Sequence, residues 1–114
     1  MNSAIDWAGI DSLETLETCI FEAADVFADR GTTTAWLAAN GFQTLPPQDV
    51  PASSMRFLTE TGAAGWLVSG TMSRDSIPFR LGFLDRFVVH SLSVGITLDE
   101  TEKPVRVAAT FTRT

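Results

Sequence analysis

The chain has 114 residues, of which 45% are hydrophobic and 19% are charged, and these are ordinary values for a folded domain. We expect a single domain over residues 1–114, because this length matches the commonest domain size and leaves little room for a second independent core. The formal net charge of −6 disfavours direct binding to nucleic acid or to an anionic membrane.

The sequence predicts neither a membrane span nor a secretory signal. Its longest nearly apolar stretch, residues 87–98, is interrupted by His90 and several hydroxyl side chains, and it is shorter than the roughly 20 residues that cross a bilayer. The first ten residues contain Asp6 and have no basic segment followed by a long apolar one. We therefore expect a cytoplasmic location, although a chain trimmed of its signal would look the same.

The first predicted element is an amphipathic helix over about residues 12–29. We expect Asp11 to be its N-cap, with Glu14 three residues later in the capping-box position. Arg30 and Gly31 are expected to end the helix, because glycine readily adopts the left-handed conformation found there. Its predicted apolar face consists of Leu13, Leu16, Ile20, Ala23 or Ala24, and Phe27.

A second, shorter helix is predicted over residues 35–39, with the threonines at 32–34 offering a cap and Asn40-Gly41 ending it. The two helices are expected to form a hairpin. Residues 43–54 contain three prolines and are predicted to be a loop or an irregular connection. The pattern over residues 55–59 is compatible with either a short strand or one helical turn.

Beyond residue 62 the apolar residues alternate with period two, which predicts antiparallel strands over about residues 66–72, 79–83, 88–98 and 105–111. In the third of these, His90 shares the parity of the apolar row that contains Leu92. The predicted fold class is α+β, a two-layer sandwich in which the N-terminal helical hairpin packs on a three- to four-stranded antiparallel meander sheet.

The chain carries few groups suited to catalysis, since it has one histidine, one cysteine, one lysine and no tyrosine. One histidine and one cysteine cannot complete a structural zinc site, and the glycines at 62, 65 and 70 do not open a helix as a phosphate-binding loop would. We therefore predict no catalytic residue, metal or cofactor. Cys19 is interpreted as a small hydrophobe within the first helix.

These features favour a non-enzymatic protein-interaction or regulatory module, with a protein partner or a second copy of the chain. Two surfaces are candidates, the acidic face of the first helix and the predicted edge strand at residues 105–111, which could pair with a strand of a partner. A tryptophan before the first helix could cap the edge of the core or anchor a partner. The candidate interaction residues are Trp7, Glu14, Glu17, Glu22 and Asp25.

Two alternative functions remain open. The first is a small-ligand-binding protein or enzyme whose pocket lies between the helices and the sheet, with His90 as a ligand-binding residue and Arg80 or Trp66 at the mouth. An arginine there could bind an anion or a carboxylate. The second is an acidic inhibitor or decoy that places the first helix in a basic groove of another protein.

Overall fold

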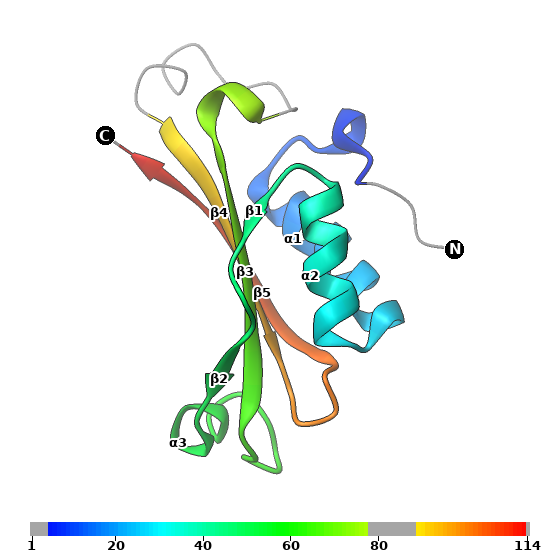
Figure 1. The fold of residues 1–114 in the computed structure, drawn as a ribbon, viewed down its shortest axis with the longest axis vertical. Coiled ribbons are helices and arrows are strands. Elements are labelled where there is room, and N and C mark those ends of the chain that lie inside the picture. Colours follow the sequence, from blue (N-terminus) through cyan, green and yellow to red (C-terminus); the bar gives the residue numbers. More distant parts are fainter. Residues whose placement is uncertain (1–4, 78–88, 114) are drawn as a thin grey trace.

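The computed structural model describes residues 5–77 and 89–113. An antiparallel sheet forms one layer, and α1 and α2 cover one of its faces as the second layer, which confirms the predicted α+β fold class (Figure 1). In the described ranges, no helix is long and apolar enough to cross a membrane. The elements are η1 (Trp7–Gly9), α1 (Leu13–Phe27), α2 (Arg30–Ala39), β1 (Gln43–Thr44), β2 (Gln48–Val50), α3 (Ala52–Met55), β3 (Gly65–Ser73), η2 (Arg74–Ser76), β4 (Val89–Leu98) and β5 (Pro104–Arg113).

The sheet has the order β1-β3-β4-β5, with β2 also pairing with β3. β3 and β4 form its centre, in a register that runs from Trp66 opposite Leu98 to Ser73 opposite Ser91. β5 pairs antiparallel with β4 and is the last strand in this order. The predicted strand at 79–83 falls outside the described residues.

The prediction of a loop over residues 43–54 is wrong, because β1 and β2 both add to the outer edge of β3, and α3 begins at Ala52. Pro46 and Pro47 separate the two short strands. Proline lacks a backbone donor but is tolerated at a sheet edge, where it need not pair on both sides. Sequence patterning therefore missed the strands because each is only two or three residues long.

Residues 55–59 prove to be the end of α3 and a helical turn after it. The N–H of Thr59 donates to the carbonyl of Met55 at 2.9 Å, as in one turn of helix. The Met55 side chain is fully buried, which holds this segment against the end of the sheet.

The core lies between the helices and one face of the sheet. Leu16 and Ile20 of α1 and Leu37 of α2 are fully buried there, so the predicted apolar face of the first helix is confirmed. Alternate side chains of β3 and β4 are buried against them. The buried residues of these two strands include Val68, Met72, Leu92, Val94, Ile96 and Leu98.

The first helix begins and ends differently from the prediction. Ser12, not Asp11, is its N-cap, and the Ser12 hydroxyl accepts a hydrogen bond from the N–H of Thr15 at 3.2 Å. Asp11 accepts a hydrogen bond from the Thr15 hydroxyl at 2.9 Å instead. The helix ends at Phe27, and Ala28 adopts the left-handed conformation with a φ of 48°.

α2 begins earlier than predicted because Asp29 is its N-cap. The Asp29 carboxylate accepts a hydrogen bond from the N–H of Thr32 at 2.6 Å, which satisfies a free donor of the first turn. Arg30 and Gly31 therefore start the second helix rather than end the first. The predicted end of α2 is correct, since Asn40 is its C-cap and Gly41 follows with a φ of 96°.

Two aspartates make the stability of the fold dependent on pH. The pKa of Asp29 is lowered, chiefly by the N–H of Thr32. For Asp99, partial burial acts in the opposite direction, but hydrogen bonds from Thr101 and Lys103 outweigh it and lower the pKa of this carboxyl as well. The ionised form of each group is favoured in the folded state.

We expect the stability contributed by Asp29 and Asp99 to be complete above the ordinary aspartate pKa of about 4 and to be lost as the pH falls through their lower folded-state values. An Asp29→Asn/Asp99→Asn double variant keeps an acceptor at both positions but cannot titrate. Its urea midpoint should therefore fall less than that of the original chain between pH 5 and pH 2. The difference between the two falls should correspond to the stability that the ionised Asp29 and Asp99 contribute. Equal losses in the two proteins would contradict this assignment.

Candidate functional site

His90 lies in β4 but does not belong to the apolar row. Val89 is opposite Arg113 and Ser91 is opposite Thr112, so His90 is an extra residue on its strand, at a bulge. Its side chain is exposed. The predicted core-facing position is wrong because the bulge interrupts the strict alternation on which that prediction depended.

Trp66 lies at the other end of the sheet from His90. It is opposite Leu98, eight residues along β4 from His90, which corresponds to about 26 Å of extended strand. The structure therefore does not bring these two candidate ligand-binding residues together. The third, Arg80, lies outside the described residues.

Trp66 instead belongs to a cluster that joins the start of α2 to the turn between β4 and β5. The Arg30 guanidinium lies 3.8 Å from the centre of the Trp66 ring, a cation–π contact. Glu102 accepts hydrogen bonds from the backbone N–H of Arg30 at 2.7 Å and from its Nη1 at 3.0 Å. These contacts give the guanidinium an ion-pair partner and an aromatic partner within the protein, which indicates a structural role for the cluster.

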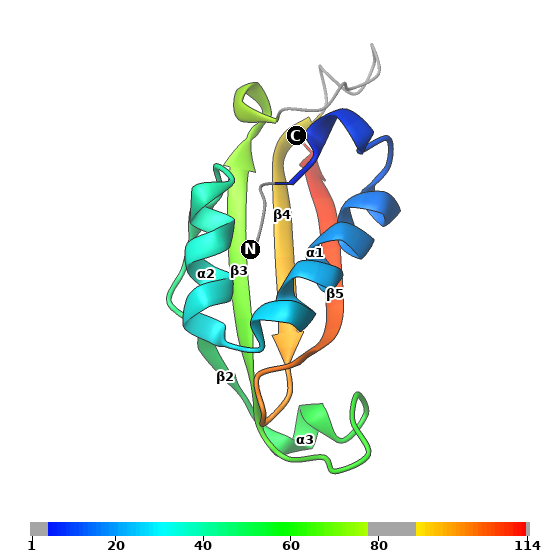
Figure 2. The same cartoon turned by 90° about the vertical axis from the view of Figure 1, so that its right-hand side faces the viewer.

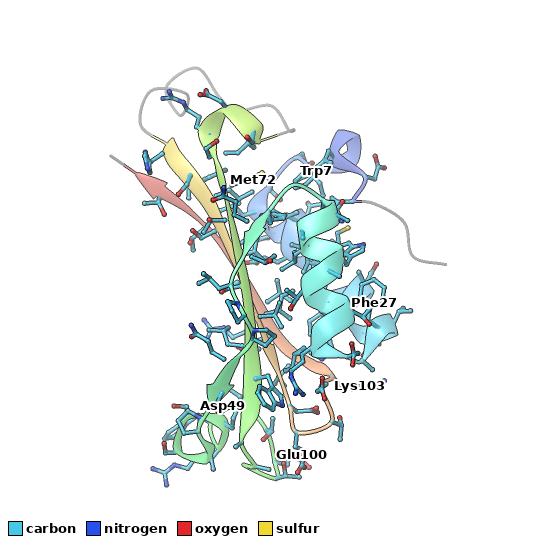
Figure 3. All side chains as sticks on the ribbon, viewed as in Figure 1. Trp7, Phe27, Asp49, Met72, Glu100 and Lys103 are labelled. Carbon is cyan, nitrogen blue, oxygen red and sulfur yellow. The ribbon has the colours of Figure 1, made fainter. Side chains whose placement is uncertain are left out.

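Trp7 packs at one end of the helix layer (Figure 3). Its ring centre is 6.2 Å from that of Phe42, and the side chain is partly buried against the core. The same segment is held by Asn40, whose side-chain oxygen accepts a hydrogen bond from the N–H of Ile5 at 2.8 Å. Of the two predicted roles for Trp7, its position supports capping of the core edge.

The predicted acidic residues lie together along one side of α1. The helical period places Glu14, Glu17, Glu22 and Asp25 on the flank that turns from the sheet toward solvent. Phe21 lies among them and is 37% exposed, although most large apolar side chains of α1 face the core. The described structure therefore has an acidic flank with an aromatic ring at its centre.

A groove of about 330 Å³ runs between this flank and β5. It combines two carboxylates with apolar surface from both layers. Its lining residues are Glu17, Thr18, Phe21, Glu22 and Val107. Its volume is at the lower end of the range of small-molecule pockets, and it lies open at the edge of the molecule.

Glu17 connects the groove to the sheet edge. Its Oε2 accepts a hydrogen bond from the backbone N–H of Ala109 in β5 at 2.8 Å. In an antiparallel strand every second N–H points away from the paired neighbour, so this group belongs to the outer edge of β5. Two surfaces that the sequence suggested separately, the acidic helix and the edge strand, are thus one continuous site.

Sequence analysis did not identify Phe21 as a site residue. One signal for it was present, because Phe21 falls outside the helical spacing of the apolar face and among the acidic positions. No sequence signal indicated that Val107 would face α1 across a groove, since this depends on how the helix crosses the sheet.

The single cysteine of the chain, Cys19, is partly buried in α1. Partial burial raises the pKa of the Cys19 thiol, and a backbone hydrogen bond at Asp6 lowers it by less, so the reactive thiolate is disfavoured. Within residues 5–77 and 89–113, no three metal-ligating side chains form a cluster.

Comparisons with protein-family models, curated proteins and solved structures found nothing that matches the chain.

Proposed function

We propose that this protein is a non-enzymatic protein-interaction module that binds a basic segment of a partner in the groove between α1 and β5. The observation that carries the proposal is the combination of Glu17, Glu22 and the exposed Phe21 ring beside an edge strand. Long basic side chains suit this surface, because their charged ends can reach the carboxylates while their methylene stems pack on the aromatic ring.

The charge of the groove favours a basic partner over a second copy of the chain. In the described structure, Lys103 is 3.8 Å from Asp25, and no ion pair involves Glu14, Glu17 or Glu22. Pairing two copies along this edge would bring their acidic flanks together, and like charges across an interface oppose association. For the same reason we do not propose a nucleic acid or an anionic membrane as the partner.

The groove also supports a macromolecular partner more strongly than the small-ligand alternative. It is small and open, and its lining continues into the edge of β5 rather than enclosing a ligand. We propose a cytoplasmic location for this interaction, in which the free thiol of Cys19 would stay reduced.

The test is the affinity for a capped ten-residue peptide in which lysine alternates with threonine, measured by calorimetry at low salt. A Glu14→Lys/Glu22→Lys variant should bind this peptide at least about tenfold more weakly, because it reverses the charge of the acidic flank. The matched control is Asp49→Lys/Glu60→Lys, which changes the net charge equally. Asp49 is exposed in β2, on the sheet edge opposite β5 (Figure 3).

The control variant should retain most of the affinity. An equal loss in both variants would show a response to net charge alone and would contradict a site at the groove. An original chain that does not bind the peptide would also overturn the proposal. Circular dichroism of each variant checks that the fold is retained.

A further inference from the structure

We infer that the partner segment binds as an additional strand along β5, and that the Glu17 carboxylate is a placeholder which it displaces. This inference rests on the proposed function and specifies the partner further, as an extended segment with basic side chains at every second position. Two features of β5 support the inference. An added strand could pair with its outer edge, and the side chains of that strand would extend the two faces of β5, which differ from each other.

The outer edge of β5 is available in the described structure. β5 pairs with β4 alone, and no strand within residues 5–77 or 89–113 pairs with its other side. Such an edge presents N–H and C=O groups that can bind the backbone of an extended chain. Figure 2 shows β5 at the border of the sheet with α1 crossing beside it.

Glu17 occupies the position that a neighbouring strand would use. Its carboxylate bonds to the N–H of Ala109, where the carbonyl of an added strand would lie. When a partner carbonyl takes this N–H, Glu17 is released next to the incoming segment and can pair with a basic side chain. The N–H of Ala109 then bonds to the partner carbonyl in place of Glu17, so displacing Glu17 leaves no unsatisfied donor.

The two faces of β5 determine the side-chain pattern of the partner. Val107 and Ala109 face α1, whereas Ala108, Thr110 and Thr112 lie on the uncovered face of the sheet. Side chains of an added strand alternate in the same way. Those on the helix side would meet the acidic groove, and those on the other side would continue the face that carries Ala108, Thr110 and Thr112.

The experiment compares two capped peptides, each with five lysines and five threonines. In one peptide the residues alternate, and in the other all five lysines precede the threonines, so charge and composition are the same. We expect the alternating peptide to bind at least about tenfold more tightly and to slow amide hydrogen exchange at Val107, whose N–H shares the outward direction of Ala109.

Glu17→Ala tests the placeholder. In the free variant the Ala109 amide should exchange faster than in the original chain, and the alternating peptide should restore its protection. Glu17→Gln, which keeps an acceptor, is the control and should exchange more slowly than Glu17→Ala in the free state. If the peptide failed to protect the Ala109 amide in Glu17→Ala, the proposal that a peptide carbonyl replaces Glu17 as the acceptor for this amide would be overturned.

The outcomes separate the two proposals. Equal binding of both peptides, weakened by Glu14→Lys/Glu22→Lys, would overturn strand addition but leave the basic-partner function in place. Binding of neither peptide would overturn both. Protection of the Val107 amide by the alternating peptide alone would support strand addition directly.

Discussion

Replacing Gly65 with alanine is expected to lower the free energy of unfolding by about 3 kcal/mol or more. Gly65 is buried at the start of β3, and a Cβ atom there would overlap the backbone carbonyl oxygen of Leu98 in β4. It would also lie 2.9 Å from the terminal methyl of Met55. The methionine side chain can move, but the Leu98 carbonyl belongs to a paired strand and can shift only if the sheet distorts.

Gly95→Ala is the matched control, because it also adds one methyl group to a glycine in a central strand. At Gly95 the nearest atom would be Leu67 Cδ1 at 3.6 Å, an ordinary contact. We expect a change within about 1 kcal/mol, since glycine is unfavourable in a strand and alanine fits there. Urea unfolding of both variants gives the comparison, and similar stabilities would contradict the close approach at Gly65.

The second large effect is expected for Ile20→Ala, which should destabilise the fold by about 3 kcal/mol. Ile20 is 0% exposed and contacts the buried residues of the sheet from the middle of α1. Removing its side-chain atoms loses their transfer free energy and leaves a cavity that the surrounding core can fill only in part. The loss should appear as a lower urea midpoint with an unchanged slope.

Val26→Ala provides the control on the same helix. Val26 is 79% exposed, so its truncation removes little buried surface, and alanine has the higher helix propensity. Its stability should therefore stay within about 0.5 kcal/mol of the original chain. If Val26→Ala were as destabilising as Ile20→Ala, the orientation of α1 described above would be wrong.

The contrast between Ile20 and its neighbour Phe21 separates stability from the proposed function. Ile20 faces the core, whereas Phe21 is partly exposed and lines the groove. The two roles of α1 are thus carried by adjacent residues, because successive side chains on a helix point about 100° apart. Binding experiments on the acidic flank can therefore be made without disturbing the core.

Local patterns were sufficient where the element was long and regular. The acidic, amphipathic first helix and the alternating strands predicted at residues 88–98 and 105–111 follow from periods of 3.6 and 2, which depend on the backbone geometry alone. The helix boundaries were less well predicted, because Asp29 could end the first helix or cap the second. In the structure Asp29 caps the second helix, because its carboxylate accepts a hydrogen bond from the N–H of Thr32.

The sequence by itself determined the fold class, the core-facing residues of α1 and the separate presence of an acidic helix and an edge strand. Only the tertiary structure decided that Glu17 reaches Ala109, that Phe21 and Val107 share a groove, and that His90 is turned outward at a bulge. These features depend on strand register and on how α1 crosses β5. Both are set by contacts between residues far apart in the chain, which no local period records.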